Sequence, residues 1–258
     1  MTAQPMLARA AHALARLPSA CGVLLMLALP ATAQIPDTFA NLQVLPQDIT
    51  RESLIEIMRG FSFALGVRCQ YCHVGGDGIS FEGVEFHKDD DEDKRKARFM
   101  LRMVETLNRY VLPMTPERDE PPVTIECKTC HRGLARPLLL KQDLLLVTHE
   151  VGVDSAVQRY RQLREDFALS GSYDFGEWET NQVAEMLEAE GRIRDAIVIY
   201  ELNAEFYPES VSIAASLAGL YEREGEVEAA IGYYERVLEL RPGHRGAQAR
   251  LEALRSQQ

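Results

Sequence analysis

Two copies of the pattern C-x-x-C-H constrain this chain more than any other feature of its sequence. The first copy, CQYCH, occupies residues 69–73, and the second copy, CKTCH, occupies residues 127–131. Each copy places two thiols three positions apart and an imidazole directly after the second thiol. The local fold must therefore present all three side chains to whatever each copy binds.

Three chemistries use a pair of cysteines at this spacing. A thioredoxin-like dithiol needs one C-x-x-C after a strand in a βαβ unit, but this chain has two copies flanked by helical and loop patterns. A zinc site can take four thiolates from the two pairs, but it leaves His73 and His131 without a role. Covalent haem attachment uses every element, because the thiols form thioethers to the vinyl groups and the imidazole binds the iron.

The sequence therefore predicts two covalently bound haem c groups, each with its own iron. The predicted ligands are Cys69, Cys72 and His73 for the first haem, and Cys127, Cys130 and His131 for the second. Arg132 and Arg136 follow the second copy. They can pair with haem propionates through a guanidinium fork, or they can lie in solvent.

A helix is expected before each copy. The first helix has Thr50 or Ser53 as its N-cap and Gly66 at its end. The second begins in the run DDDEDKRKAR, where acids lead into bases as the helix dipole favours, and continues to about Val111. We interpret this charged run as a solvated helix entrance.

Met58 and Met100 stand at matching points of these two helices. Methionine opposite histidine is the cytochrome c arrangement, so both are predicted sixth ligands, with Met103 and Met114 as alternatives for the second haem. The other interpretation is that they are flexible fillers of the apolar core. Two filled sixth positions predict an electron carrier, whereas an open position would favour a haem enzyme of the peroxidase type.

The first 33 residues have the pattern of a secretory signal peptide. Arg9 and Arg16 precede the apolar run ACGVLLMLALPA, and ATA forms a small-x-small cleavage site before Gln34. The apolar run has about a dozen residues, fewer than the ~20 that a spanning helix needs. We expect cleavage, with an uncleaved anchor as the alternative, and an exported, periplasmic protein that is soluble, peripheral to the membrane or extracellular. No transmembrane segment is expected in the mature chain.

Cleavage would also change the charge and the cysteine count. It removes two of the 28 basic residues and none of the 39 acidic ones, which leaves a formal charge of −13. Nucleic acid is disfavoured as a partner because phosphate binding needs a basic face, and a basic protein partner is favoured. Cys21 is removed, so every remaining cysteine lies in a C-x-x-C-H copy. Two disulfides would suit an exported protein but would not need the histidines.

A 34-residue repeat marks the C-terminal part of the chain. The recurring pairs are Gly191 and Gly225, Ala196 and Ala230, Ile197 and Ile231, Tyr200 and Tyr234, and Pro208 and Pro242. Glycine in the turn, alanine at the helix crossing and proline at the end resemble the tetratricopeptide repeat. We expect repeats at 177–210 and 211–244 and a capping helix at 245–256. A helix at 154–168, capped by Asp154, or the first domain would cover the exposed end of the array.

The haem-binding part resembles the cytochrome c subunit of bacterial photosynthetic reaction centres. The resemblance rests on NLQVLPQDITRESLIEIMRGFSFALGVRCQYCH, ARFMLRMVETLN and CKTCHRG, over roughly 38–137. In that family each haem unit is a helix with the axial methionine, a turn and C-x-x-C-H, which implies Met58 with His73 and Met100 with His131. This chain has two motifs where that family has four, lacks a lipid-bearing cysteine at its expected mature end and adds a repeat domain. We therefore expect a two-haem relative that serves another electron chain.

The expected fold class is mainly α. The expected organisation is a signal peptide at 1–33, a two-haem cytochrome c domain at 34–140, a helical connector at 141–174 and a tetratricopeptide-repeat domain with a capping helix at 175–258. The expected function is electron transfer between redox partners. The repeat domain is expected to dock a redox protein or a second copy of the same chain.

Maturation in a periplasm that attaches haem is expected to add the mass of two haem groups to residues 34–258. Thioether bonds survive denaturation, so denaturing mass spectrometry and the absorption of the reduced haem measure the count. A chain that gains no mass and holds zinc would instead support a scaffold in which only the repeats function.

Overall fold

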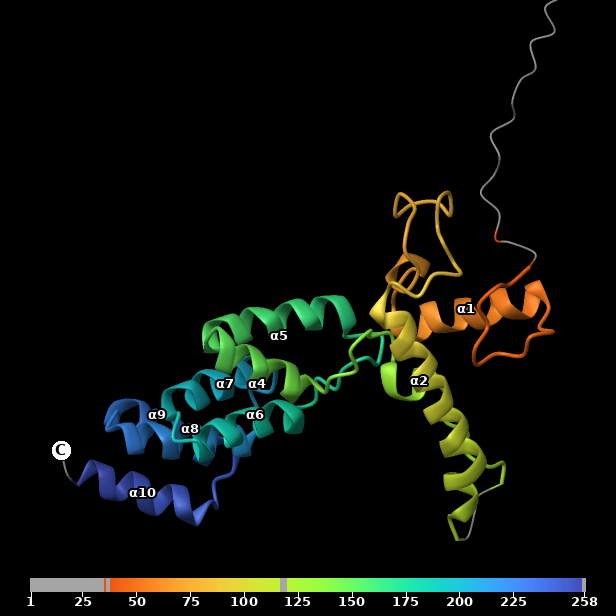
Figure 1. Cartoon of the computed structure of the whole chain (residues 1–258). Coiled ribbons are helices and arrows are strands. Elements are labelled where there is room, and N and C mark those ends of the chain that lie inside the picture. The colour runs from red at the N-terminus through yellow and green to blue at the C-terminus, as the bar shows by residue number, and fades with distance from the viewer. Residues whose placement is uncertain (1–34, 36–37, 117–119, 257–258) are drawn as a thin grey trace, which may run out of the picture.

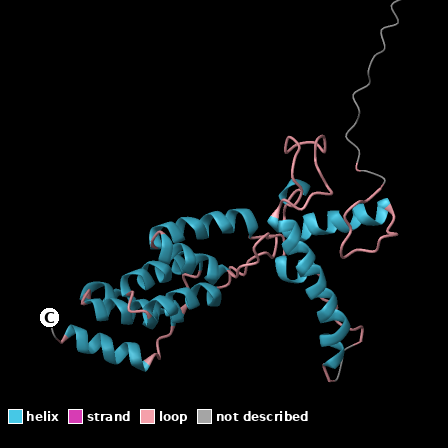
Figure 2. Ribbon diagram, viewed as in Figure 1, coloured by secondary structure: helices cyan, strands magenta, loops and turns pink. Residues whose placement is uncertain are grey.

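The computed structural model describes residues 35, 38–116 and 120–256, so the predicted signal peptide lies outside the described residues. Within these ranges the chain is helical and contains no strand, which confirms the mainly α fold class (Figure 2). One isolated antiparallel bridge, between Gly75 and Val84, closes the loop after the first motif. No helix in the described part is long and apolar enough to cross a membrane.

The N-terminal half contains two long helices and the short turns that carry the motifs. Its elements are α1 Arg51–Leu65, η1 Cys69–Tyr71, α2 Glu92–Thr106, η2 Leu107–Val111, η3 Leu112–Met114 and α3 Cys127–His131. The α-helical part of α2 ends before the expected Val111, because a π turn and a 3-10 turn continue it to Met114. We call residues 38–133 the motif segment.

Local capping explains where these helices begin and end. The Thr50 side chain accepts a hydrogen bond from the Ser53 backbone N–H at 3.2 Å, which satisfies a free donor of the first turn of α1. Gly66 ends α1 in the left-handed conformation with φ 68°, as the sequence predicts. Asp91 caps α2 by accepting from the Asp93 N–H at 2.7 Å.

The C-terminal half is an array of antiparallel helix pairs. Its elements are α4 Leu140–Glu150, α5 Val153–Phe167, α6 Glu177–Ala189, α7 Ile193–Phe206, α8 Val211–Glu224, α9 Val227–Leu240 and α10 Arg245–Arg255. Consecutive helices pair as α4 with α5, α6 with α7 and α8 with α9, and α10 packs on α9. In Figure 1 this array extends away from α1 and α2, with the C-terminus at its far end.

The pair formed by α4 and α5 continues the array toward the motif segment, because α4 packs on α6 and α5 packs on α7. The expectation that a helix near 154–168 covers the end of the array agrees with this packing.

The expected N-cap of this helix, Asp154, was wrong. Gly152, with φ 123°, is the N-cap of α5, and Asp154 lies inside the first turn, where its charge favours the helix dipole.

The packed core belongs to the array. One buried cluster joins α4 to α8, and a second joins α8 to α10. Side chains such as Leu144, Tyr160 and Leu187 are fully enclosed. Among the described residues of the motif segment, Leu54 and Ala64 are the only apolar side chains that are buried. The array therefore has a packed core made of its own side chains, whereas the described part of the motif segment has no comparable core.

Leu144→Ala is expected to destabilise the protein by about 2–5 kcal/mol, because it opens a cavity where the side chain is fully enclosed. Leu169→Ala is the matched control, since Leu169 is fully exposed, and should change stability by less than about 0.5 kcal/mol. Urea unfolding followed by circular dichroism measures both variants. Equal effects from the two substitutions would contradict this core.

Candidate haem-attachment sites

The first motif forms a tight turn directly after α1. Cys69 begins a 3-10 turn, and its carbonyl accepts from the Cys72 N–H at 3.2 Å and from the His73 N–H at 3.1 Å. Because these bonds close the backbone on itself, the two thiols and the imidazole are carried by one short, ordered turn. This is the local geometry that attachment of one group through three side chains needs.

The second motif forms the short helix α3. The Glu126 N–H donates to the Thr129 hydroxyl at 2.9 Å at its start. The segment that enters α3 is clamped by Asn108, whose side chain accepts from the Ile125 N–H at 2.8 Å and donates to the Ile125 carbonyl at 2.7 Å. Since Asn108 belongs to η2, the end of the α2 region positions the second motif.

His131 has a partner that orients its ring. Its Nδ1 lies 2.8 Å from the Leu134 carbonyl oxygen. In the tautomer that carries its proton on Nδ1, this nitrogen donates to the carbonyl and Nε2 keeps its lone pair for a metal. Metal-binding histidines in proteins commonly have such a partner.

His73 is held differently. Its ring packs edge-on against Phe86 with centroids 5.0 Å apart, and its Nδ1 is buried without a hydrogen-bond partner. Burial, with the nearby charge of Lys94, lowers the pKa of His73 to about 4, although the Phe86 carbonyl and Asp91 oppose this shift. The imidazole is therefore neutral at pH 7, as metal binding requires.

The thiols are poorly suited to thiolate chemistry. Burial, with the nearby charges of Asp91 and Asp93, raises the pKa of Cys72 to about 11, and burial also raises the pKa of Cys127. Reactive dithiols have lowered pKa values instead. The described residues contain no group of three or more His, Cys, Asp or Glu side chains placed to hold one metal ion. The two cysteine pairs are therefore not assembled into one four-thiolate cluster.

Each motif is held against the helix that precedes the other motif. The Gly133 N–H, just after the second motif, donates to the Ala64 carbonyl of α1 at 2.8 Å. A Cβ at Gly66 would collide with the Gly133 carbonyl oxygen, so glycine permits this approach. At the first motif, the His73 ring packs against the Phe86 ring. The Phe86 carbonyl accepts a hydrogen bond from the Lys94 ammonium of α2. The two motifs and two helices therefore form one unit.

The methionines lie on the two helices as expected. Met58 is half-buried on α1, and Met100 is 41 % exposed on α2. Met103 and Met114, the alternatives for the second haem, are also exposed. No described contact joins any of these sulfur atoms to His73 or His131, so the methionine ligands stay predictions.

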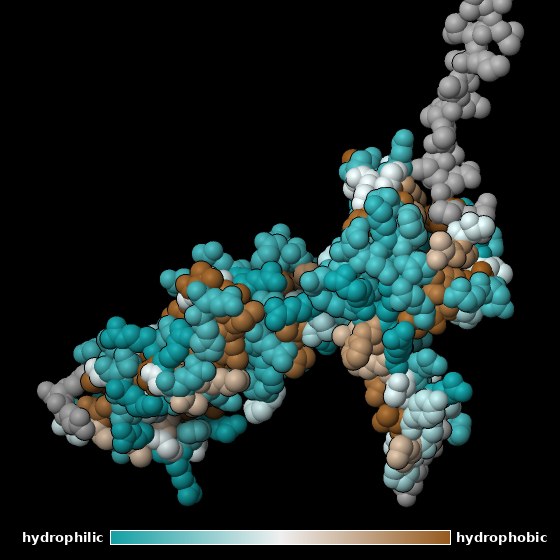
Figure 3. All heavy atoms as spheres, viewed as in Figure 1, coloured by the Kyte–Doolittle hydropathy of each residue, from teal (hydrophilic) through white to brown (hydrophobic). Residues whose placement is uncertain are grey.

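The motif segment has a large apolar surface that its own side chains do not cover. The exposed apolar residues include Phe63, Phe99, Met100, Met103, Tyr110, Val111 and Met114. Figure 3 shows apolar atoms at the surface around α1 and along α2, where α2 extends from the rest. A porphyrin offers two wide apolar faces. This surface, the neutral imidazoles and the paired thiols are a side-chain set that fits haem.

Arg132 adds a charged group beside the second site. It follows His131 with φ 50°, and its Nε is buried without a partner. Its carbonyl accepts from the Ser172 hydroxyl at 2.6 Å, so the array fixes the backbone here. An anionic group such as a haem propionate would satisfy this nitrogen. Arg136 is exposed and shows no comparable feature.

A family model described as "Photosynthetic reaction centre cytochrome C subunit" matches residues 33–144. This part of the chain, which contains both motifs and both helices, is therefore similar to that family. The match indicates a c-type cytochrome that functions in electron transfer and carries covalently bound haem c. It also indicates an electron carrier rather than an enzyme. The search for curated relatives returns no match.

Sequence reasoning missed the residues that support the motifs from a distance. Lys94 was expected to be solvated within its charged run, but it is buried because it reaches back to the loop before α2. Asn108 and the Leu134 carbonyl also gave no signal, since their roles depend on tertiary contacts.

Gly66→Ala is expected to cost more than about 2 kcal/mol, because it places a side chain in a left-handed residue and against Gly133. Gly60→Ala is the control within the same helix. Its Cβ would meet nothing within 4 Å, so it should stabilise α1 by about 0.5–1 kcal/mol. Thermal unfolding of both variants measures the difference. Similar stability of the two would contradict the contact between α1 and the second motif.

Proposed function

We propose that the protein is an exported di-haem c-type cytochrome that transfers electrons between redox partners. The first haem would be tethered by Cys69 and Cys72 with His73 on its iron. The second would be held in the same way by the second motif. The observation that carries the proposal is that two complete C-x-x-C-H motifs are packed into one unit, each with a neutral or correctly hydrogen-bonded imidazole.

Haem, when bound, supplies an iron that exchanges one electron between Fe(III) and Fe(II). The chain supplies the tethers, the histidine ligands and an apolar surface that keeps water from the porphyrin. Met58 and Met100 are the proposed sixth ligands, which would close both irons to substrates and raise the reduction potentials. The proposed role is therefore carriage of electrons without catalysis.

The two sites share a framework, which supports electron exchange between them. The C-terminus of α1 contacts the segment after the second motif through Ala64 and Gly133. The loop after the first motif contacts α2 through Phe86 and Lys94. Two haems attached to such a unit would be held at a fixed separation, so that one could pass an electron to the other.

We propose that the helical array is a tetratricopeptide-type domain that docks a redox protein. The starts of α6 and α8, and of α7 and α9, are each displaced by 34 residues, which supports the repeat assignment. Residues 141–256 carry 22 acidic against 12 basic side chains, a difference of −10, which favours a partner with a basic surface. A second copy of the chain is the alternative occupant.

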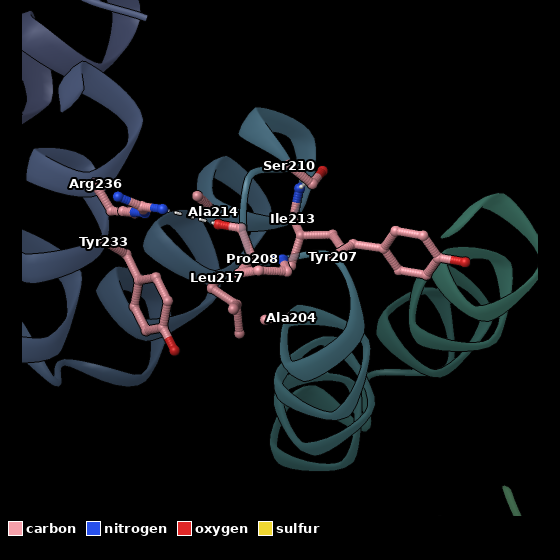
Figure 4. A pocket seen from close by; sticks show the side chains of 9 residues that line it. All are labelled: Ala204, Tyr207, Pro208, Ser210, Ile213, Ala214, Leu217, Tyr233 and Arg236. Carbon is pink, nitrogen blue, oxygen red and sulfur yellow. Dashed lines mark hydrogen bonds between the residues drawn. The ribbon is translucent and has the colours of Figure 1, made fainter. Parts of the chain in front are cut away.

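The array offers one pocket where α7, α8 and α9 meet (Figure 4). Tyr207, Pro208 and Tyr233 contribute apolar surface, and Arg236 donates to the Pro208 carbonyl at 3.0 Å. An apolar side chain of a docked protein would fit this lining. Docking through the acidic surface should weaken as salt is added, because exposed charges are screened.

A peroxidase-type enzyme with one open iron is the second candidate. The observation in its favour is that Met100, the proposed ligand of the second iron, is 41 % exposed. A high-spin haem that binds peroxide or cyanide readily would support it. Two low-spin haems with methionine coordination would support the carrier.

Met58→Ala and Met100→Ala are each expected to change one haem of the two. Loss of a thioether ligand should remove the methionine-to-iron charge-transfer band of that haem and lower its reduction potential. Met186→Ala is the control, since Met186 lies exposed on α6 of the array. Spectroelectrochemical titration measures both haems in each variant. Unchanged spectra and potentials in both ligand variants would make the assignment wrong.

A further inference from the structure

Lys94 is a buried cation beside the first motif. It is only 9 % exposed, although it belongs to a strongly charged run. Its Nζ donates to the Phe86 carbonyl at 2.8 Å and to the Lys88 carbonyl at 2.5 Å, and it lies 3.1 Å from an Asp89 carboxylate oxygen. These three oxygens match the three donors of an ammonium group. The side chain is therefore held in one position.

One residue, Phe86, separates Lys94 from the histidine of the first motif. The Phe86 carbonyl receives the ammonium, and the Phe86 ring packs edge-on against His73 at 5.0 Å. Lys94 thus holds Phe86 in place, and the Phe86 ring positions the imidazole. A buried positive charge held beside Phe86, next to this ring, disfavours the extra positive charge of Fe(III) over Fe(II).

Lys94 shares its paired carboxylate, Asp89, with a second cation. Asp89 is shared with Arg98, whose guanidinium lies 2.7 Å away and holds the pKa of Asp89 well below its usual range. The trio of Lys94, Arg98 and Asp89 therefore carries a net charge of +1. Asp93 is paired with Lys96 at 3.0 Å, and Asp91 is the carboxylate that offsets this charge. Lys94 is the buried member, so water screens it least.

The second motif has a cation of its own, Arg132, directly after His131, but the hydrogen bonding of its histidine has the opposite bias. The His131 ring nitrogen Nδ1 has a carbonyl partner, Leu134, which makes an imidazole a stronger donor to its metal and favours Fe(III). The corresponding nitrogen of His73 is buried without a partner. This difference acts toward easier reduction at the first site, in the same direction as the buried Lys94.

We propose that Lys94 positions His73 and supplies the buried charge that raises the reduction potential of the first haem above that of the second. The proposal rests on the proposed function and adds a direction to it. An electron that a one-electron donor protein places on the second iron would move to the first. The second iron returns to Fe(III) as the first becomes Fe(II), and the first then reduces the acceptor.

The test is spectroelectrochemical titration of the two-haem protein and five variants. The component that shifts in Met58→Ala identifies the first haem. Lys94→Met and Lys94→Gln remove the charge, and the glutamine keeps a hydrogen-bond donor. Lys94→Arg keeps the charge. Arg245→Met is the control, because Arg245 is an exposed cation of α10 in the array, outside the motif segment.

We expect the first haem to have the higher potential in the native chain. Lys94→Met and Lys94→Gln should both lower that potential, Lys94→Arg should largely preserve it, and Arg245→Met should leave both haems unchanged. A first haem with the lower potential in the native chain would overturn the proposal without any variant. Two attached haems whose reduction potentials are unchanged by every Lys94 substitution would also overturn the proposal. A mature chain without two haems would instead refute the proposed function.

Discussion

The contact between the end of α1 and the residues after the second motif organises the haem-binding half. A side chain at Gly66 would collide with the Gly133 carbonyl oxygen, and the Ala64 carbonyl receives the Gly133 N–H. This contact joins the helix of one site to the attachment segment of the other. Since Leu134 then enters the core of the array, the same few residues also connect the two halves of the molecule.

The two halves are stabilised by different means. The array encloses its own leucine, tyrosine and isoleucine side chains and would lose several kcal/mol for each one truncated. The motif segment keeps Leu54 and Ala64 buried and leaves most of its large apolar residues uncovered. In the proposed cytochrome, attached haem would cover this surface and supply much of the missing core, which would link folding of that half to maturation.

Much of this organisation could be predicted from local sequence patterns. The cap at Thr50, the end of α1 at Gly66 and the mainly α class followed from side-chain spacing and glycine conformation. The cap of α5 could not, because an aspartate such as Asp154 suits the N-cap and the first turn of a helix equally well. Burial of Lys94 was also missed, since its partners are carbonyls of the preceding loop, and a charged run gives no sign of them. The methionine ligands are still predictions from sequence alone.

The central claim is that two haems are held in one rigid unit close enough to exchange electrons. Electron paramagnetic resonance of the fully oxidised protein, compared with the Cys127→Ala/Cys130→Ala variant, tests it most directly. The account predicts two low-spin ferric signals that broaden each other through magnetic coupling, and a sharper single signal in the variant. Two independent, unbroadened signals, or a high-spin signal from either site, would contradict it.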